Sequence, residues 1–125
     1  MKILESAENY LETILMLQEE KGYARSIDVA NHLHFSKPSV SVAMKNLREN
    51  GYITVEDEGH LELTALGRSI AEKMYERHKL LTAWLVFMGV DQATAAEDAC
   101  RMEHVISVQT FEAMKAHFAD EHGIR

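Results

Sequence analysis

Residues 26–50 place the strongest constraint on the fold of this chain. Residues 26–33 and residues 37 or 38 to about 50 have the length and apolar spacing of two short helices. Between them lies a break at His34-Phe35-Ser36, in which Ser36 is suited to cap the second helix. Pro38 falls in the first turn of that helix, where proline is tolerated. The pattern predicts two helices joined by a tight turn, a helix-turn-helix.

The next stretch narrows the fold further. Residues 52–56 and 60–63 alternate apolar and polar side chains around Asp57-Glu58-Gly59, which is typical of a β-hairpin closed by a glycine-containing turn. A hairpin directly after a helix-turn-helix is a wing. We therefore expect residues 1–64 to form a winged helix-turn-helix domain. Its first element is a helix over about residues 7–20, which comes before the helix-turn-helix itself.

The rest of the chain is predicted to be helical. Apolar spacing indicates a long helix over residues 65–88, a second over 92 to about 105, and a third from about residue 107. The last two are too short to bury their apolar sides alone, which favours a partner subunit. The predicted fold class is mainly α, with an N-terminal winged helix-turn-helix followed by an all-helical dimerisation domain over residues 65–125.

Charge and composition limit the possible partners. The chain carries a net charge of −7, yet residues 25–50 hold four basic and two acidic side chains, a net charge of +2. A locally basic helix-turn-helix in an acidic protein is compatible with DNA binding. The single cysteine excludes an internal disulfide, and no apolar run approaches the roughly 20 residues of a membrane span. We expect a cytoplasmic protein without membrane contact.

A second feature suggests chemistry rather than fold. Cys100, Glu103 and His104 stand at i, i+3 and i+4 of a predicted helix, so a thiol, a carboxylate and an imidazole share one face. Together they form a plausible half-site for a divalent transition metal. Their own spacing does not identify further ligands. Glu12 fits a solvated acidic helix face, and His78, in an apolar seam, fits a core histidine.

Six segments, in order, resemble the DtxR/MntR family of metal-dependent transcriptional repressors. They cover essentially the whole chain, and the last is the most specific. They are residues 8–12 (ENYLE), 19–25 (EEKGYAR), 39–41 (SVS), 63–67 (LTALG), 77–81 (RHKLL) and 99–104 (ACRMEH). The resemblance implies the short, two-domain form of the family, without its SH3-like domain, and a protein that is not an enzyme.

The resemblance also implies a metal site drawn from three helices. By matched position, its ligands are Asn9, Glu12, His78, Cys100, Glu103 and His104. Asn9 stands where the family usually has aspartate or methionine, and an amide oxygen is a weaker ligand. Cys100 is typical of the iron-sensing members, whereas Glu12 and His78 together resemble the manganese type. Because thiolate is softer than carboxylate, we expect iron(II) to be favoured over manganese(II), with zinc(II), cobalt(II) or nickel(II) binding in vitro.

The implied function is repression by a homodimer on double-stranded operator DNA, with no small organic substrate. Metal ligation from both domains would fix the spacing of the two DNA-binding domains of the dimer, here called its reading heads. Base edges or phosphates would be contacted by the exposed polar and basic positions of the helix-turn-helix, together with two apolar positions suited to thymine methyl groups. The predicted DNA-binding residues are Arg25, Ser36, Lys37, Pro38, Ser39, Ser41, Val42, Lys45 and Arg48.

Three other functions fit parts of this pattern. A winged-helix regulator with a non-metal ligand would keep its operator affinity after chelation. A metalloenzyme would need a general base apart from the ligands, and the sequence offers no clear candidate. A structural zinc module would unfold on chelation, whereas a sensor would keep its helices and lose only operator affinity.

Overall fold

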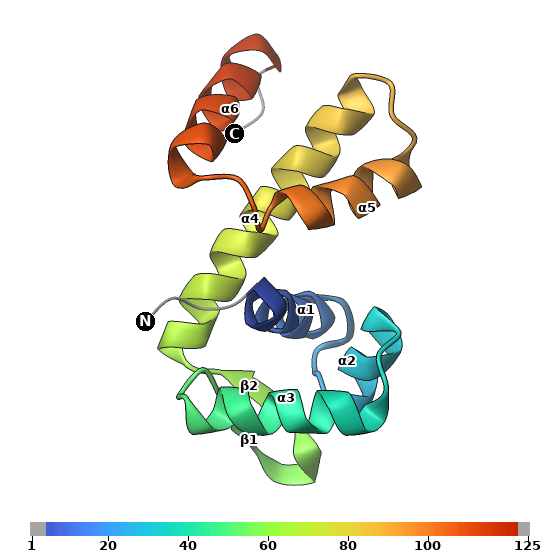
Figure 1. The fold of residues 1–125 in the computed structure, drawn as a ribbon, viewed down its shortest axis with the longest axis vertical. Helices are drawn as coiled ribbons and strands as arrows, with labels where there is room; N and C mark the ends of the chain where they lie inside the picture. Colours follow the sequence, from blue (N-terminus) through green and yellow to red (C-terminus); the bar gives the residue numbers. More distant parts are fainter. Residues whose placement is uncertain (1–4, 123–125) are drawn as a thin grey trace. The chain divides into compact units, whose positions relative to one another are not determined.

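The computed structural model describes residues 5–122 and the side chains of residues 5–118. The described chain is mainly helical with one small hairpin, and the elements follow one another as the sequence predicts (Figure 1). In order, they are α1 (Glu5–Lys21), α2 (Ser26–Leu33), α3 (Lys37–Glu49), β1 (Ile53–Val55), a short 3-10 helix η1 (Asp57–Gly59), β2 (Leu61–Leu63), α4 (Ala65–Phe87), α5 (Gln92–Met102) and α6 (Val108–His122).

The chain divides into two compact units, and the division falls inside α4, between Tyr75 and Glu76. The first unit contains α1 to β2 with the first part of α4, and the second contains the rest of α4 with α5 and α6. None of the helices within residues 5–122 combines the length and apolarity needed to cross a membrane.

The first unit is a winged helix-turn-helix. α1 contacts α2 and β2, α2 contacts α3, and α3 contacts β1. β1 and β2 pair antiparallel, with Thr54 opposite Glu62, and η1 forms the tip of the wing. One core joins the helices and the two strands, as expected when each contributes a single apolar stripe. Its buried side chains are Leu11, Ile14, Leu15, Leu17, Ala24, Val29, Ala30, Val40, Met44, Leu47, Ile53, Leu61 and Ala71.

Local capping explains where α3 and its neighbours begin and end. The Ser36 hydroxyl accepts a hydrogen bond from the Ser39 amide (3.3 Å), so the predicted cap is confirmed. In the turn before α3, His34 takes the left-handed conformation (φ 59°), and its amide bonds back to the Ala30 carbonyl. The N-cap residue of α2 is Arg25, directly before Ser26. Its amide donates a hydrogen bond to the Asp28 carboxylate (3.1 Å). Arg25 is therefore held at the helix start.

The second unit is built from three helices with a small core of its own. Leu80, Phe111 and Phe118 are buried together, with Trp84 packed against them. Lys115 donates to the Glu76 carboxylate (2.9 Å), which ties α6 to α4 and raises the pKa of the Lys115 ammonium. At the start of α5, the Asp91 carboxylate accepts from the Thr94 amide and hydroxyl, and these bonds lower the pKa of Asp91.

α5 ends at Met102, about three residues before the predicted end near Val105. Glu103 keeps a helical backbone (φ −62°, ψ −24°), and its amide still bonds to the Ala99 carbonyl (3.0 Å). The carbonyl of Glu103, however, accepts from the Arg77 side chain (2.8 Å). A side chain from α4 thus supplies a partner for a carbonyl group in the turn that follows α5.

Thr64 joins the wing to α4. Its hydroxyl lies 2.7 Å from the Gly51 carbonyl oxygen and 3.1 Å from that of Tyr52, and it accepts from the Gly67 amide (3.1 Å). The helix start is thereby pulled against the turn before β1. A Cβ atom on Gly67 would lie only 2.0 Å from the Tyr52 carbonyl oxygen, so this contact has room only for glycine.

We therefore expect Gly67→Ala to destabilise the winged unit. In a free helix this change stabilises by about 1 kcal/mol, but overpacking against a backbone carbonyl typically costs about 1–3 kcal/mol or more. Urea denaturation followed by circular dichroism measures the net effect. Ser69→Ala, at an exposed position of the same helix, is the control and should be neutral or slightly stabilising. A more stable Gly67→Ala variant would contradict the tight contact.

Candidate metal centre and nucleic-acid interface

Glu103 is the centre of the candidate metal site. Its side chain is 0% exposed, which is unusual for a carboxylate, and it is reached by two histidines. His78 Nδ1, from α4, lies 3.1 Å from Glu103 Oε2, and His104 Nε2 lies 3.3 Å from Glu103 Oε1. Both oxygens of one buried carboxylate therefore meet imidazole nitrogens within the second unit.

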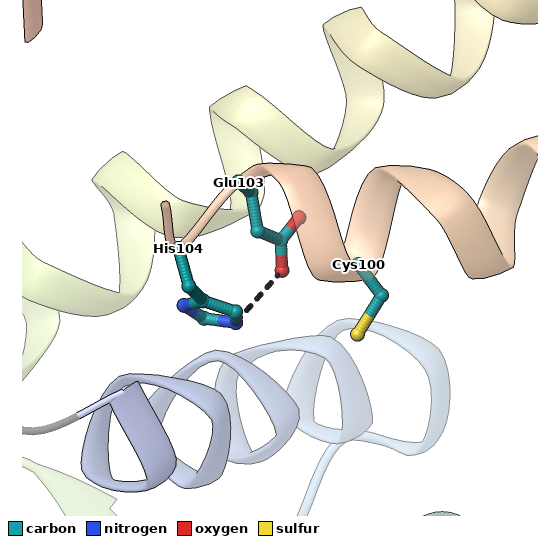
Figure 2. A group of neighbouring side chains, drawn as sticks. All are labelled: Cys100, Glu103 and His104. Atoms are coloured by element: carbon teal, nitrogen blue, oxygen red, sulfur yellow. Dashed lines mark ion pairs between the residues drawn. The ribbon is translucent and has the colours of Figure 1, made fainter. Parts of the chain in front are cut away.

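Cys100 adds a sulfur donor to this group. One donor atom each from Cys100, Glu103 and His104 lies within 4.8 Å of the others, and Figure 2 shows the three side chains on the same side of the end of α5. The structure brings the three side chains together, as their spacing predicts, although Glu103 and His104 both lie just beyond α5, in the turn at its end. The spacing works because Glu103 still has helical backbone angles.

This donor set fits a divalent transition metal. A buried carboxylate with two imidazoles and a thiol offers anionic and neutral donors of intermediate softness, which suit Mn(II), Fe(II) or Zn(II) more than Ca(II) or Mg(II). Burial of Glu103 without a cation would be costly, because an isolated carboxylate loses its hydration. The chemistry of the residues present thus agrees with a metal-binding role.

The other two predicted ligands lie on α1, in the first unit. Glu12 is buried (2% exposed) and Asn9 is partly buried. A buried glutamate on α1 differs from the solvated acidic face that the helix pattern alone suggested. Carboxylates on a protein surface are rarely buried, whereas those that bind a metal often are. The burial of Glu12 is therefore compatible with a role as a metal ligand.

All nine predicted DNA-binding residues are exposed. Eight of them lie on α3 or at its N-cap and form one polar and basic surface, with Val42 61% exposed among them. Ser36 is partly committed, since its hydroxyl caps the helix and donates to the Ser39 hydroxyl (2.8 Å). An exposed apolar side chain beside hydroxyls and cations is the composition expected of a recognition helix.

Arg25 is oriented by two neighbouring rings. Its guanidinium lies 5.3 Å from the centre of the Tyr23 ring, and Nη2 is 3.3 Å from His60 Nε2. Tyr23 and His60 stack on one another, with ring centres 5.5 Å apart. A stacked, hydrogen-bonded guanidinium keeps little rotational freedom, so it is prepared for contact with an anion.

The sequence pattern does not single out Arg77 within the 77–81 segment, yet it is one of the few charged side chains buried within the described residues. An arginine next to a histidine inside an apolar seam was the available signal.

A DNA-reading winged helix and a helical part with a metal-binding donor set together define a metal-responsive DNA-binding protein. Residues 2–61 match the family described as "Iron dependent repressor, N-terminal DNA binding domain". Residues 64–120 match "Iron dependent repressor, metal binding and dimerisation domain". The chain belongs to this iron dependent repressor family, the DtxR/MntR family. The two matched domains of this family are described as binding DNA and as binding metal and dimerising.

Individual relatives agree with this assignment. The chain is 40% identical to the HTH-type transcriptional regulator MntR of Shouchella clausii over 82% of its own length and 71% of the relative's. It is 35% identical to the transcriptional regulator MntR of Escherichia coli O157:H7, over 97% and 77%.

Solved structures match the fold as well. A manganese-dependent transcriptional repressor in complex with manganese is 28% identical, with a TM-score of 0.81 over 90% of this chain. The manganese regulator SloR (24% identical, TM-score 0.78) has the same fold. The chain spans about half the length of these two structures, 52% and 53%.

Proposed function

We propose that this chain is a cytoplasmic, homodimeric repressor that binds operator DNA when manganese(II) or iron(II) is abundant. The observation that carries the proposal is the fully buried Glu103 carboxylate held between His78 and His104, with the Cys100 sulfur nearby. It lies in the part of the chain that matches a metal-binding and dimerisation domain.

Glu12 and Asn9 are proposed to add ligands from α1. The family resemblance selects them, and the burial of Glu12 supports that choice. A bound divalent ion would supply two positive charges and a common attachment point. Ligands from both units would then restrict the movement of one unit against the other, so that the two reading heads of a dimer keep a spacing that suits two major-groove half-sites. A coupling of about 1–3 kcal/mol per site is usual for such linkage.

The expected preference for iron(II) over manganese(II) is not supported by the relatives. It depended on the soft sulfur of Cys100, whereas solved relatives are described as a manganese-dependent repressor and a manganese regulator. We propose instead that both ions activate the protein and that manganese(II) is at least as effective as iron(II). Cys100 is then the ligand that keeps iron(II) competitive.

Operator binding titrated with metal tests the function. Genomic fragments are first selected on the protein in separate pools with manganese(II), anaerobic iron(II), zinc(II) or chelator. We expect one fragment set to be enriched with manganese(II) and iron(II), and its affinity to fall by about 5- to 150-fold on chelation. Circular dichroism of the chelated protein should show unchanged helicity.

The alternatives give different results in the same experiment. Equal affinity with and without metal would contradict the metal-dependent function and favour a regulator with a non-metal ligand. Loss of helicity on chelation would favour a structural zinc module.

The role of Cys100 is tested by Cys100→Glu. A carboxylate in place of the thiol should shift the affinity ratio toward manganese(II) on the order of tenfold, or about 1.4 kcal/mol, since the harder ligand suits the harder ion. Isothermal titration with each ion under anaerobic conditions measures the ratio. Cys100→Ser, which removes the sulfur without adding charge, is the control and should weaken both ions. An unchanged ranking in Cys100→Glu would exclude Cys100 as the selecting ligand.

Lys45 on α3 is proposed to contact DNA phosphate. Lys45→Ala should weaken binding to all DNA sequences alike and reduce the slope of log affinity against log salt by about 1. Fluorescence anisotropy between low and moderate salt gives that slope. Arg101→Ala removes an exposed cation from α5 instead and should leave the slope unchanged. Equal slopes in wild type and Lys45→Ala would place Lys45 away from the DNA backbone.

A further inference from the structure

Arg77 is a buried cation next to the candidate metal site. It lies on α4, directly before His78, and only 5% of the residue is exposed. Arginine is rarely buried without specific partners, because its charge loses hydration. The partners that the structure gives it therefore indicate what it does.

Those partners are backbone carbonyls and an aromatic ring. Nη1 donates to the carbonyl oxygen of Glu103 (2.8 Å) and to that of Ile106 (3.1 Å). The guanidinium lies 5.3 Å from the centre of the Phe111 ring. Within the part of the chain that the structure describes, no carboxylate forms an ion pair with it. Arg77 thus binds the main chain of one turn, residues 103–106, and stacks on the helix that follows it.

The turn held by Arg77 carries two of the proposed ligands. Glu103 and His104 lie in it, while His78 is the neighbour of Arg77 on α4. The last carbonyls of a helix lack intrahelical partners and carry partial negative charge, so a cation at that end is favourable. Arg77 therefore fixes the turn at the end of α5 against the part of α4 that carries His78, the third proposed ligand.

We propose that Arg77 is a positioning residue for the metal site. Its guanidinium holds the 103–106 turn so that the Glu103 carboxylate lies between the His78 and His104 imidazoles before metal binds. A planar fork that stacks and donates at the same time suits this role, and a lysine would supply only a point charge. The inference rests on the proposed metal-dependent function and adds a residue that does not itself ligate.

The experiment uses the full chain with Arg77→Met and Arg77→Lys. Arg101→Met is the matched control: Arg101 lies on α5, is paired with Glu97 (2.9 Å), and its side chain is 74% exposed. Three quantities are measured on each protein: manganese(II) affinity by isothermal titration, the visible absorption spectrum with cobalt(II), and the melting temperature without metal. The cobalt(II) spectrum responds to ligand geometry, which a loss of stability alone does not change.

We expect Arg77→Met to weaken manganese(II) binding by about 10- to 100-fold, as when other residues that orient metal ligands are lost. The cobalt(II) bands should shift, and Arg77→Lys should fall between Arg77→Met and wild type. Arg101→Met should match wild type in all three measurements.

A lower melting temperature with unchanged manganese(II) affinity and cobalt(II) spectrum in both Arg77 variants would overturn the positioning role and leave only a structural one. If Arg77→Met does not fold, Arg77→Lys decides in the same way, because it keeps the charge. Wild-type protein that binds neither manganese(II) nor iron(II) would overturn the proposed function, and the role of Arg77 with it. Wild-type binding with unaffected Arg77 variants would overturn only the inference.

Discussion

A carboxylate without solvent contact is the constraint on which the second unit depends. Moving a carboxylate out of water costs several kcal/mol even after the protein relaxes, so Glu103 must be matched by donors. His78 and His104 each approach one of its oxygens, and the main chain of Glu103 is held by Arg77. The contacts of His78 and Arg77 with Glu103 join segments that are 25 and 26 residues apart in sequence. Apolar residues of similar volume in place of this buried ionic group would often be at least as stabilising. The buried carboxylate and its imidazole neighbours therefore indicate a site that binds charge, and stability alone does not explain them.

In the first unit, helix caps and close backbone contacts fix the positions of the helix starts. Thr64 and Gly67 fix the start of α4 against the turn before β1, and Ser36 fixes the start of α3. The core beneath these elements is apolar. The core uses only the apolar side of α3. The polar side of α3 therefore stays exposed on a rigid unit. A rigid reading head is what a spacing-dependent switch needs, since flexibility would weaken the link between metal binding and half-site spacing.

Local chemistry could be predicted from the sequence, and contacts between distant segments could not. Ser36 as a cap and the grouping of Cys100 with Glu103 depend on neighbours three residues away, so spacing was enough to find them. The hydrogen bond from Arg77 to the carbonyl of Glu103 spans 26 residues, and the periodicity of neither helix predicts it. His78 is similar. In its own helix it fits an apolar seam, and only the approach of Glu103, 25 residues later, distinguishes it from a core histidine. The family resemblance proposes it as a ligand because it compares whole sites rather than single helices.

The distribution of charge gives metal binding a second consequence. The chain carries a net charge of −7 while its recognition surface is basic, so attraction to DNA is local and the rest of the protein opposes it. Two further acidic side chains, Asp57 and Glu58, lie at the exposed tip of the wing, where they disfavour contact with phosphate. A dimer with two positive charges added to each subunit would lose part of this repulsion. Because exposed charges further apart than about 8 Å are largely screened at physiological salt, that effect is smaller than the geometric one for sites away from the DNA. Under the proposed function, the spacing of the two DNA-binding units would then provide most of the coupling, and the positions of the Glu103 and His104 side chains would matter more than the charge of the ion.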